Sequence, residues 1–498
     1  MKRTNSCLFT RPFVSRALLV HRPVRLPSGR RRTAYRPRTK AEHMPKQPNI
    51  LILWCDQMQY ARQGRIDEVS HTPNLDKLWD EGIPFTHAYT VHAQCVPSRA
   101  ALMTGQSPHE CGVMVNYGFY DHQNMLTKKH STLAHVLRDA GYKTAYYGKS
   151  HLGSPLENLG FDHGRNYDTV RIEDDEAEQL GIGHVPLMLR RDYKAAWDAV
   201  DFLQTYQPVE QPLFFVFSTN LPHPPFFSEQ KYAHLFPPDQ MKLSTSFYEE
   251  TFEGKPPFQK AHALDGSHGA SDEAGAKKEL ADYYTMIAMT DEHIGAVIEE
   301  YKRLGIWDDT LVLFLSDHGD MMGAHRMRLK GTLPYEELYH VPCIFKLPAG
   351  IFSARTAIDD LVSSQAFAGT LLKLANIDVP SEFTGGHFTE AFTRIHHPDD
   401  EHLFFEHYAA YWGLHPFYGV RTRTMKYVRY YGEDDTEELY DLEKDPDELR
   451  NLAGDAQYVE VQRDLTNRAD TWWKSTDGRD VAYYESDFFR QNLHNKVD

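Results

Sequence analysis

Four apolar runs in this 498-residue chain each end in side chains that could do chemistry. The groups just beyond the runs are Asp56 and Gln57, Lys149 and His151, His223, and Asp317 and His318. Carboxylates, amides, imidazoles and ammonium groups bind metal ions, neutralise anions and transfer protons. If the runs are strands of one sheet, their ends would bring all of these groups to a single site.

The four apolar runs have the pattern of buried strands. They occupy residues 50–55, 144–147, 213–218 and 311–315 and are continuous rather than alternating, which is typical of parallel strands covered on both faces. The intervening residues predict helices at 74–81, 98–103, 132–140, 193–204 and near 277–304. In open α/β sheets the functional crevice lies outside the carboxyl ends of the strands, so the four polar groups should converge there.

The character of the chain changes near residue 380. Aromatic-rich segments at 403–408, 417–423, 426–431 and 438–441 predict a small antiparallel sheet, and residues 466–476 predict a closing helix with Trp472 or Trp473 packed against it. We therefore predict an α/β fold with a large, mostly parallel sheet sandwiched by helices at 44–379 and a smaller C-terminal α+β subdomain at 380–498. The long polar connection at 226–276 is either a lid over the crevice or a disordered insertion.

Charge is distributed unevenly along the sequence. The net charge is −16, yet residues 1–41 hold twelve Lys or Arg and no Asp or Glu. We expect residues 1–43 to lie outside the fold, as a stretch upstream of a true start at Met44, an organellar presequence or a disordered tail. The acidic remainder argues against a nucleic-acid partner, because such partners require a clustered positive face.

Targeting signals are not apparent in the sequence. No apolar stretch approaches the roughly 20 residues that cross a bilayer, and arginines interrupt the short apolar run in the basic arm. The cysteines are odd in number and widely spaced, unlike a disulfide framework: Cys7, Cys55, Cys95, Cys111 and Cys343. We therefore expect a cytoplasmic protein without a membrane partner.

The most specific signal is the string from Cys95 to Gly105, which reads CVPSRAALMTG. It resembles the signature C-x-P-S-R-x-x-x-x-T-G of the sulfatase family in the alkaline phosphatase superfamily. The resemblance extends over residues 48–453 and includes GKSH at 148–151, PHP at 222–224, SDHGD at 316–320 and LYDL at 439–442. Several matches in one order argue against coincidence.

The resemblance implies a modified residue and a metal ion. In that family a maturation enzyme oxidises the signature cysteine to Cα-formylglycine, here at Cys95. One hydroxyl of its hydrate, held on a divalent metal, attacks sulfur, and the other later loses a proton to expel sulfate. The metal ligands implied by the resemblance are Asp56, Gln57, Cys95, Asp317 and His318.

Further catalytic residues lie within the same motifs. Arg99 follows Cys95 by four residues, so in a helix it can return to the metal carboxylates. Lys149 and Lys330 would contact sulfate oxygens as point charges. By resemblance His151 supports the formylglycine hydroxyl, while His223 and Lys330 face the leaving oxygen. His325 either lines the pocket or has a core or capping role.

Two metal-ligand positions depart from the common sulfatase pattern. Many sulfatases have a second Asp in place of Gln57 and an Asn in place of His318, whereas this chain resembles the branch that includes choline sulfatases and phosphonate monoester hydrolases. We expect Ca²⁺, with Mg²⁺ as an alternative; because the imidazole is a borderline ligand, Mn²⁺ is also a candidate. Otherwise Gln57 is a hydrogen-bonding residue at a strand end and His318 supports a ligand from behind.

The resemblance implies hydrolysis of a sulfate monoester of a carbohydrate, aryl or small alkyl alcohol. A phosphonate monoester or phosphodiester hydrolase on the same scaffold is the alternative, and a non-catalytic scaffold for anionic glycans is a third. The substrate rim could use residues of the C-terminal aromatic segment, although such stripes more often form core: His407, Tyr408, Trp412, His415 and Arg421. Members of the similar branch often assemble, so an oligomer is possible.

Overall fold

A computed structural model describes most of the chain. It covers residues 47–116, 125–168, 190–207, 211–266, 269–394, 401–409, 413–430 and 436–478, with residue 487. The predicted basic arm at 1–43 and Trp412 lie outside these residues. The chain from Gln47 onward forms one compact unit. Among the described residues, no helix is long and apolar enough to cross a membrane.

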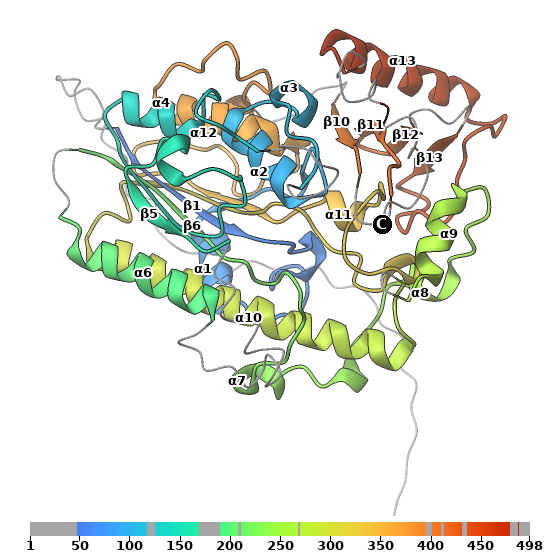
Figure 1. The fold of residues 1–498 in the computed structure, drawn as a ribbon, viewed down its shortest axis with the longest axis horizontal. Coiled ribbons are helices and arrows are strands. Elements are labelled where there is room, and N and C mark those ends of the chain that lie inside the picture. The colour runs from blue at the N-terminus through green and yellow to red at the C-terminus, as the bar shows by residue number, and fades with distance from the viewer. Residues whose placement is uncertain are drawn as a thin grey trace, which may run out of the picture. The chain divides into compact units, whose positions relative to one another are not determined.

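A seven-stranded sheet lies at the centre of the fold (Figure 1). Its strands are β1 (Asn49–Cys55), β2 (Ile83–Pro84), β4 (Lys143–Gly148), β5 (His163–Asn166), β6 (Leu213–Ser218), β7 (Thr310–Ser316) and β8 (Cys343–Lys346). The strand order is β2-β8-β7-β1-β6-β4-β5. The five strands from β7 to β5 are parallel, and β8 is antiparallel to β7. All four predicted strands are neighbours in the parallel part, which confirms the predicted fold class.

Helices cover both faces of this sheet (Figure 1). One face carries α2 (Cys95–Thr104), α4 (Leu133–Asp139) and α12 (Phe367–Leu374), and the other carries α1 (Pro73–Glu81), α6 (Arg191–Thr205) and α10 (Glu273–Arg303). Side chains of β1 alternate between the two cores: Ile50 and Ile52 join the first, and Leu51 and Leu53 join the second. Burial on both faces explains why this strand is continuously apolar.

The predicted helices are present with shifted ends, and the shift matters most in α2. This helix begins at Cys95 rather than near Ser98, and it ends before Gly105, whose φ of 63° lies in the left-handed region that glycine adopts without strain. Cys95 therefore occupies the first turn, and Arg99 lies one turn further along the same helix.

A second, four-stranded antiparallel sheet follows near the C-terminus, as predicted. It contains β10 (His402–His407), β11 (Phe417–Thr422), β12 (Met425–Tyr430) and β13 (Glu437–Asp441), in that order. The closing helix α13 (Val459–Ser475) begins earlier than predicted. Trp473 stacks on Tyr418 at 4.8 Å between ring centroids, and Trp472 stacks on Phe404 at 4.9 Å. Both tryptophans therefore pack against this sheet.

Residues 226–276 contain short helical segments rather than a uniform loop. These are α7 (Gln230–Ala233), the 3₁₀ segment η5 (Pro238–Gln240), α8 (Thr245–Glu249) and α9 (Pro257–Leu264). Lys255 and Gln259 are buried, and their side chains donate to the Glu448 carbonyl (2.7 Å) and to Glu438 Oε1 (2.8 Å) of the C-terminal part. This connection therefore packs against the region of the small sheet.

The remaining elements are short. They are η1 (Tyr60–Arg62), β3 (Ala88–Tyr89), α3 (Pro108–Cys111), η2 (Leu156–Leu159), η6 (Ala324–Arg326), α11 (Glu336–Tyr339), β9 (Val362–Ser363), η7 (Ser364–Ala366) and η8 (Thr389–Phe392). β3 and β9 pair in parallel as a two-stranded sheet.

Candidate active site

Strand register places two predicted aspartates side by side. β1 and β7 pair in parallel with Cys55 opposite Ser316, so the next residues, Asp56 and Asp317, leave the sheet at the same level. Both carboxylates are buried. On the other side of β1, Ser218 at the end of β6 lies opposite Gly148 at the end of β4. The four strand ends therefore meet at one edge of the sheet, as the sequence predicts.

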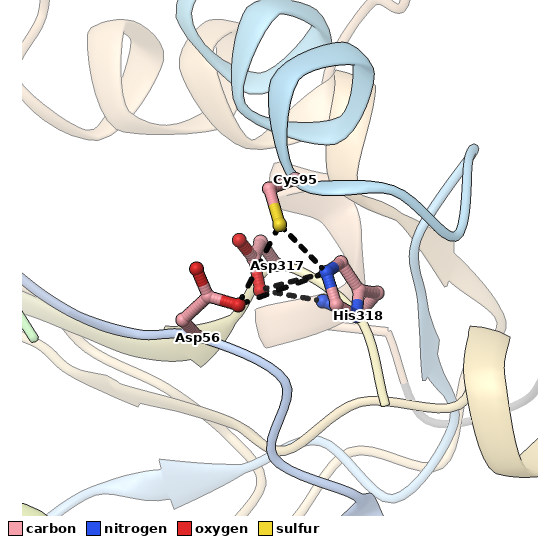
Figure 2. A group of neighbouring side chains, drawn as sticks. All are labelled: Asp56, Cys95, Asp317 and His318. Atoms are coloured by element: carbon pink, nitrogen blue, oxygen red, sulfur yellow. Dashed lines mark hydrogen bonds and ion pairs between the residues drawn. The ribbon is translucent and has the colours of Figure 1, made fainter. Parts of the chain in front are cut away.

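Four side chains converge at this edge (Figure 2). One donor atom from each of Asp56, Cys95, Asp317 and His318 lies within 4.8 Å of all the others, and all four residues are buried. Cys95 Sγ is 3.2 Å from His318 Nε2. His318 Nδ1 is 2.8 Å from the Gly319 carbonyl, to which it can only donate, so Nε2 is the ring nitrogen that faces the cluster. Two carboxylates and an imidazole nitrogen are suitable ligands for a divalent cation.

Gln57 lies beside this cluster in a left-handed backbone conformation, with φ of 71°. Its backbone N–H donates to Asp317 Oδ1 at 3.0 Å. Its side-chain Oε1 accepts a hydrogen bond from Lys330 Nζ, and its Nε2 donates to Asp320 Oδ2. The amide oxygen of the predicted ligand is therefore turned towards the ammonium group that also contacts Cys95.

Three buried cations surround residue 95. Lys330 Nζ lies 3.1 Å from Cys95 Sγ, and Lys149 Nζ lies 3.8 Å from it and contacts Asp56 Oδ2. Arg99 Nε donates to Asp317 Oδ2 at 2.7 Å, and its Nη2 is 3.6 Å from Asp56 Oδ2. The structure thus brings all three predicted cationic residues to the cluster.

These cations favour negative charge in the site. Burial alone would raise the pKa of Cys95, but the ammonium groups of Lys149 and Lys330 hold it well below its ordinary value. Burial and the neighbouring Cys95 thiolate disfavour the ionised form of Asp56, yet Lys149 keeps the pKa of Asp56 below its usual range. The pKa of Lys149 is raised in turn, because Asp56 and Cys95 outweigh its burial. An anion at residue 95 is therefore stabilised by its surroundings.

Two predicted histidines also approach Cys95. The side chain of His151 forms a hydrogen bond with the Cys95 sulfur, and its backbone N–H donates to Asp168 Oδ2 at 2.6 Å. His223 donates from Nδ1 to the Pro224 carbonyl at 2.7 Å and also forms a hydrogen bond with Cys95. Burial and the charge of Lys330 lower the pKa of His223 to about 4. Every predicted metal-ligand and catalytic residue therefore lies in or beside the cluster.

The prediction missed several residues that support the site. Arg99 Nη1 donates to Ser218 Oγ at 2.9 Å, and the guanidinium lies 4.6 Å from the ring centroid of Trp54. The backbone N–H of Val96, in the first turn of α2, donates to Asn116 Oδ1 at 3.0 Å. Trp54 and Ser218 are the last or next-to-last residues of strands, so their position was a usable signal, whereas nothing in the sequence singled out Asn116.

Most candidates for the substrate rim are buried in packing contacts. His407 stacks on His92 at 4.5 Å, and His415 stacks on Phe258 at 3.9 Å. The other candidates have similar surroundings: Tyr408 is buried, Arg421 pairs with Glu336, and His325 pairs with Glu250 and stacks on Tyr335. These contacts favour the core interpretation that the aromatic stripe had left open.

Comparisons with known proteins agree with this geometry. The sulfatase family model matches residues 48–377, and a model for the C-terminal part of N-sulphoglucosamine sulphohydrolase matches residues 323–474. The chain is 27% identical to an ulvan-active sulfatase of Formosa agariphila, over 84% of this chain and 80% of that protein. It is 28% identical to a choline-sulfatase of Rhizobium meliloti, over 82% of each chain.

Solved structures share the fold at lower identity. The phosphonate monoester hydrolase of Agrobacterium radiobacter superposes with a TM-score of 0.72 at 23% identity, over 86% of this chain and 96% of that one. A protein solved with its substrate D-glucosamine-2-N,6-O-disulfate superposes with a TM-score of 0.71 at 22% identity, over 88% and 99%. Because the family model spans most of its length, the chain belongs to the sulfatase family of the alkaline phosphatase superfamily and is a sulfuric ester hydrolase.

Proposed function

We propose that the protein hydrolyses a sulfate monoester to an alcohol and inorganic sulfate, with residue 95 as formylglycine and a divalent cation beside it. The observation that carries this proposal is the convergence of Lys149 and Lys330 on Cys95, next to the carboxylates of Asp56 and Asp317. A sulfate monoester is an anion that repels nucleophiles, so its hydrolysis requires positive charge at the point of attack.

The donor set suits a divalent cation. Asp56, Asp317 and His318 would hold the ion together with residue 95 and the side-chain oxygen of Gln57. The oxygen donors favour Ca²⁺, and the imidazole leaves Mn²⁺ and Mg²⁺ as alternatives. When bound, such a cation lowers the pKa of a hydroxyl ligand and neutralises charge on a sulfate oxygen.

The modification of Cys95 requires a maturation enzyme as a partner. Hydrated formylglycine supplies a strong oxygen nucleophile and a second hydroxyl that can lose its proton. Around this residue, Arg99 anchors the two carboxylates, His151 donates a hydrogen bond, and Lys149 holds a sulfate oxygen.

Protonation of the leaving alcohol falls to His223 and Lys330. The His223 ring is neutral in the free site because burial and Lys330 lower its pKa to about 4. A bound sulfate ester carries negative charge that offsets Lys330, so the ring can take up a proton and pass it to the leaving oxygen.

We propose a sulfated saccharide or a small alkyl or aryl sulfate as the substrate. The ulvan-active sulfatase, the choline-sulfatase and the disulfated glucosamine complex support this range. A phosphonate monoester hydrolase is the second candidate, favoured by Gln57 and His318 and by the likeness to the Agrobacterium enzyme. Comparison of kcat/KM on matched sulfate, phosphonate and phosphodiester esters separates the two.

Mass spectrometry of the peptide that carries residue 95 tests the proposal most directly. Protein made with the maturation enzyme should contain formylglycine, release sulfate and lose turnover in Cys95→Ala. Cys111→Ala is the matched control, since Cys111 is also a buried free cysteine but lies outside the cluster. Unmodified cysteine together with full turnover in Cys95→Ala would overturn the proposal.

A further inference from the structure

A buried carboxylate behind Gln57 has no role in the mechanism above. Asp320 is fully buried. Its Oδ1 accepts hydrogen bonds from the backbone N–H groups of Met322 (2.8 Å) and Leu329 (3.0 Å), and its Oδ2 accepts one from Gln57 Nε2. Each of these three groups is a donor, and the Asp320 carboxylate accepts from all of them.

The orientation of the Gln57 amide therefore has a physical cause. An amide has a donating end and an accepting end, and only the donating end can face an acceptor such as Asp320. The accepting end, Oε1, must then point the other way, where it meets Lys330 Nζ. Lys330 Nζ is also 3.1 Å from Cys95 Sγ, so this end of the amide lies beside the cluster.

The backbone of Gln57 is held independently of this contact. The Tyr283 hydroxyl, from α10, donates to the Gln57 carbonyl at 2.6 Å, and the Gln57 N–H donates to Asp317 Oδ1 at 3.0 Å. With the main chain fixed at both groups, the remaining freedom is rotation of the side-chain amide. Asp320 on one side and the Lys330 ammonium on the other both require the observed orientation of that amide.

We infer that Asp320 is a positioning residue that presents the oxygen of Gln57, rather than its nitrogen, to the divalent cation. This inference rests on the proposed function, because it takes Gln57 as a ligand of that cation. It explains how an amide can stand where many sulfatases have a carboxylate. A carboxylate offers oxygen in either orientation, whereas an amide needs a neighbour that selects the orientation.

Asp320→Asn should remove the preference for this orientation of the Gln57 amide, with little change in side-chain volume. The backbone N–H groups of Met322 and Leu329 require an acceptor, so the oxygen of the new asparagine takes the place of Oδ1 and its NH₂ group faces Gln57. The Gln57 amide then meets a donor on both sides, the new NH₂ group and Lys330 Nζ, so its own NH₂ group has lost its acceptor and its oxygen is no longer fixed towards the cation. We expect Ca²⁺ and Mn²⁺ affinity to fall by about 10- to 100-fold, the usual result of losing a partner that orients a ligand.

A second substitution distinguishes orientation from general stability. Gln57→Glu places an acceptor at both ends of the side chain. In the wild type, the Gln57→Glu carboxylate would face the carboxylate of Asp320. In combination with Asp320→Asn it accepts from the new NH₂ group and still presents an oxygen to the cation. Gln57→Glu should therefore improve affinity more in the Asp320→Asn background than in the wild type. A packing role for Asp320 predicts additive effects instead.

The experiment is isothermal titration of Ca²⁺ and of Mn²⁺ into the metal-stripped full chain, for the wild type, both single variants and the double variant. Asp291→Asn is the matched control, because Asp291 is a buried carboxylate that accepts backbone N–H groups of α1 and should leave cation affinity unchanged. If the Asp320→Asn single variant folds poorly, the test rests on the double variant, which we expect to fold and to bind the cation.

The outcomes separate this inference from the proposed function. Wild-type cation binding with unchanged affinity in Asp320→Asn, or with additive effects of the two substitutions, overturns the inference alone. A wild-type protein that binds neither cation overturns the metal site of the proposed function and the inference with it.

Discussion

Two groups of buried charges in this protein are built differently. In the strand-end cluster, Lys149 and Lys330 both approach the same sulfur, that of Cys95. The second group, the junction network, lies where α8, α9, α11 and the small sheet meet, and it consists of Glu250, Lys255, Glu336, Arg421, Lys426 and Glu448. There each cation faces a carboxylate, as in Lys255–Glu250 at 2.6 Å and Arg421–Glu336 at 3.2 Å.

The difference shows what marks the active site. Buried charge alone does not, because both groups are buried except for Glu336, whose side chain is partly exposed. Balanced pairs such as those of the junction network satisfy one another and offer little to a ligand. In the strand-end cluster Lys149 and Arg99 also contact carboxylates, but Lys330 faces the Cys95 sulfur and an amide oxygen. A cation held beside the nucleophile favours an incoming anion. Substitutions in the two groups should therefore have opposite effects on stability and on turnover.

Removing a charge from the junction network should damage stability and not chemistry. Lys426 Nζ contacts Glu448, the Pro334 carbonyl (2.6 Å) and Glu336 (3.4 Å). Lys426→Met leaves buried carboxylates without their cation and should lower the free energy of unfolding by about 3–5 kcal/mol, as measured by urea denaturation. The kcat/KM of the protein that remains folded should not change. If Lys426→Met instead lowered kcat/KM strongly and left stability unchanged, the proposed difference between the two groups would be wrong.

Removing a charge from the strand-end cluster should do the reverse. Lys330→Ala takes away one of two ammonium groups beside residue 95 and should reduce kcat/KM for a sulfate ester by about 10²–10³-fold, because positive charge is lost where negative charge develops. The melting temperature should stay the same or rise, since two like charges no longer crowd one site. Lys278→Ala, at an exposed lysine of α10, is the control and should keep full activity.

His325, which contacts Glu250 of the junction network, should impose a pH dependence on stability. Burial lowers the pKa of His325 to about 4, from an ordinary value of 6.5. Between pH 4 and pH 6.5 the imidazole therefore binds a proton in the unfolded chain but not in the folded chain. The contribution of His325 to stability is complete above pH 6.5 and is lost as the pH falls towards 4. It amounts to about 3 kcal/mol. His325→Gln should flatten the dependence of unfolding free energy on pH in this window; an unchanged slope would contradict the assignment.

An exposed ion pair should matter least. Lys231 Nζ lies 2.5 Å from Glu292 Oε1, but both side chains are about half exposed. Water and salt screen such pairs, so Lys231→Ala should change the unfolding free energy by less than about 1 kcal/mol and leave kcat/KM unchanged. A loss comparable to that of Lys426→Met would show that burial is not what separates the strong pairs from the weak ones.

Much of the fold could be predicted because the hydrophobic pattern of each segment indicates which of its faces are buried. Continuous apolar runs mark strands covered on both faces, and apolar residues at helical spacing mark α10. The helix ends were less certain: α2 starts at Cys95 and α13 starts at Val459, both earlier than predicted. Neither start has a side-chain cap, so no local signal marked it.

The site was predictable to the extent that its residues stand at strand ends or in the signature. Sequence could not show that Arg421 is bound to Glu336, or that His415 stacks on Phe258, because a stripe of aromatic and basic residues is compatible with a rim and with a core. Whether the stripe forms a rim or a core depends on the elements that pack against it.

By itself, the sequence determined which residue types follow the strands and that Cys95 begins a sulfatase signature. Only the tertiary structure decided how those groups face one another. Asp56 and Asp317 meet because of the register between β1 and β7. The Gln57 amide lies between Lys330, which donates to its oxygen, and Asp320, 263 residues away, which accepts a hydrogen bond from its NH₂ group. Periodicity describes the surroundings of one segment, whereas hydrogen bonds between distant segments depend on the pairing and packing of the whole sheet.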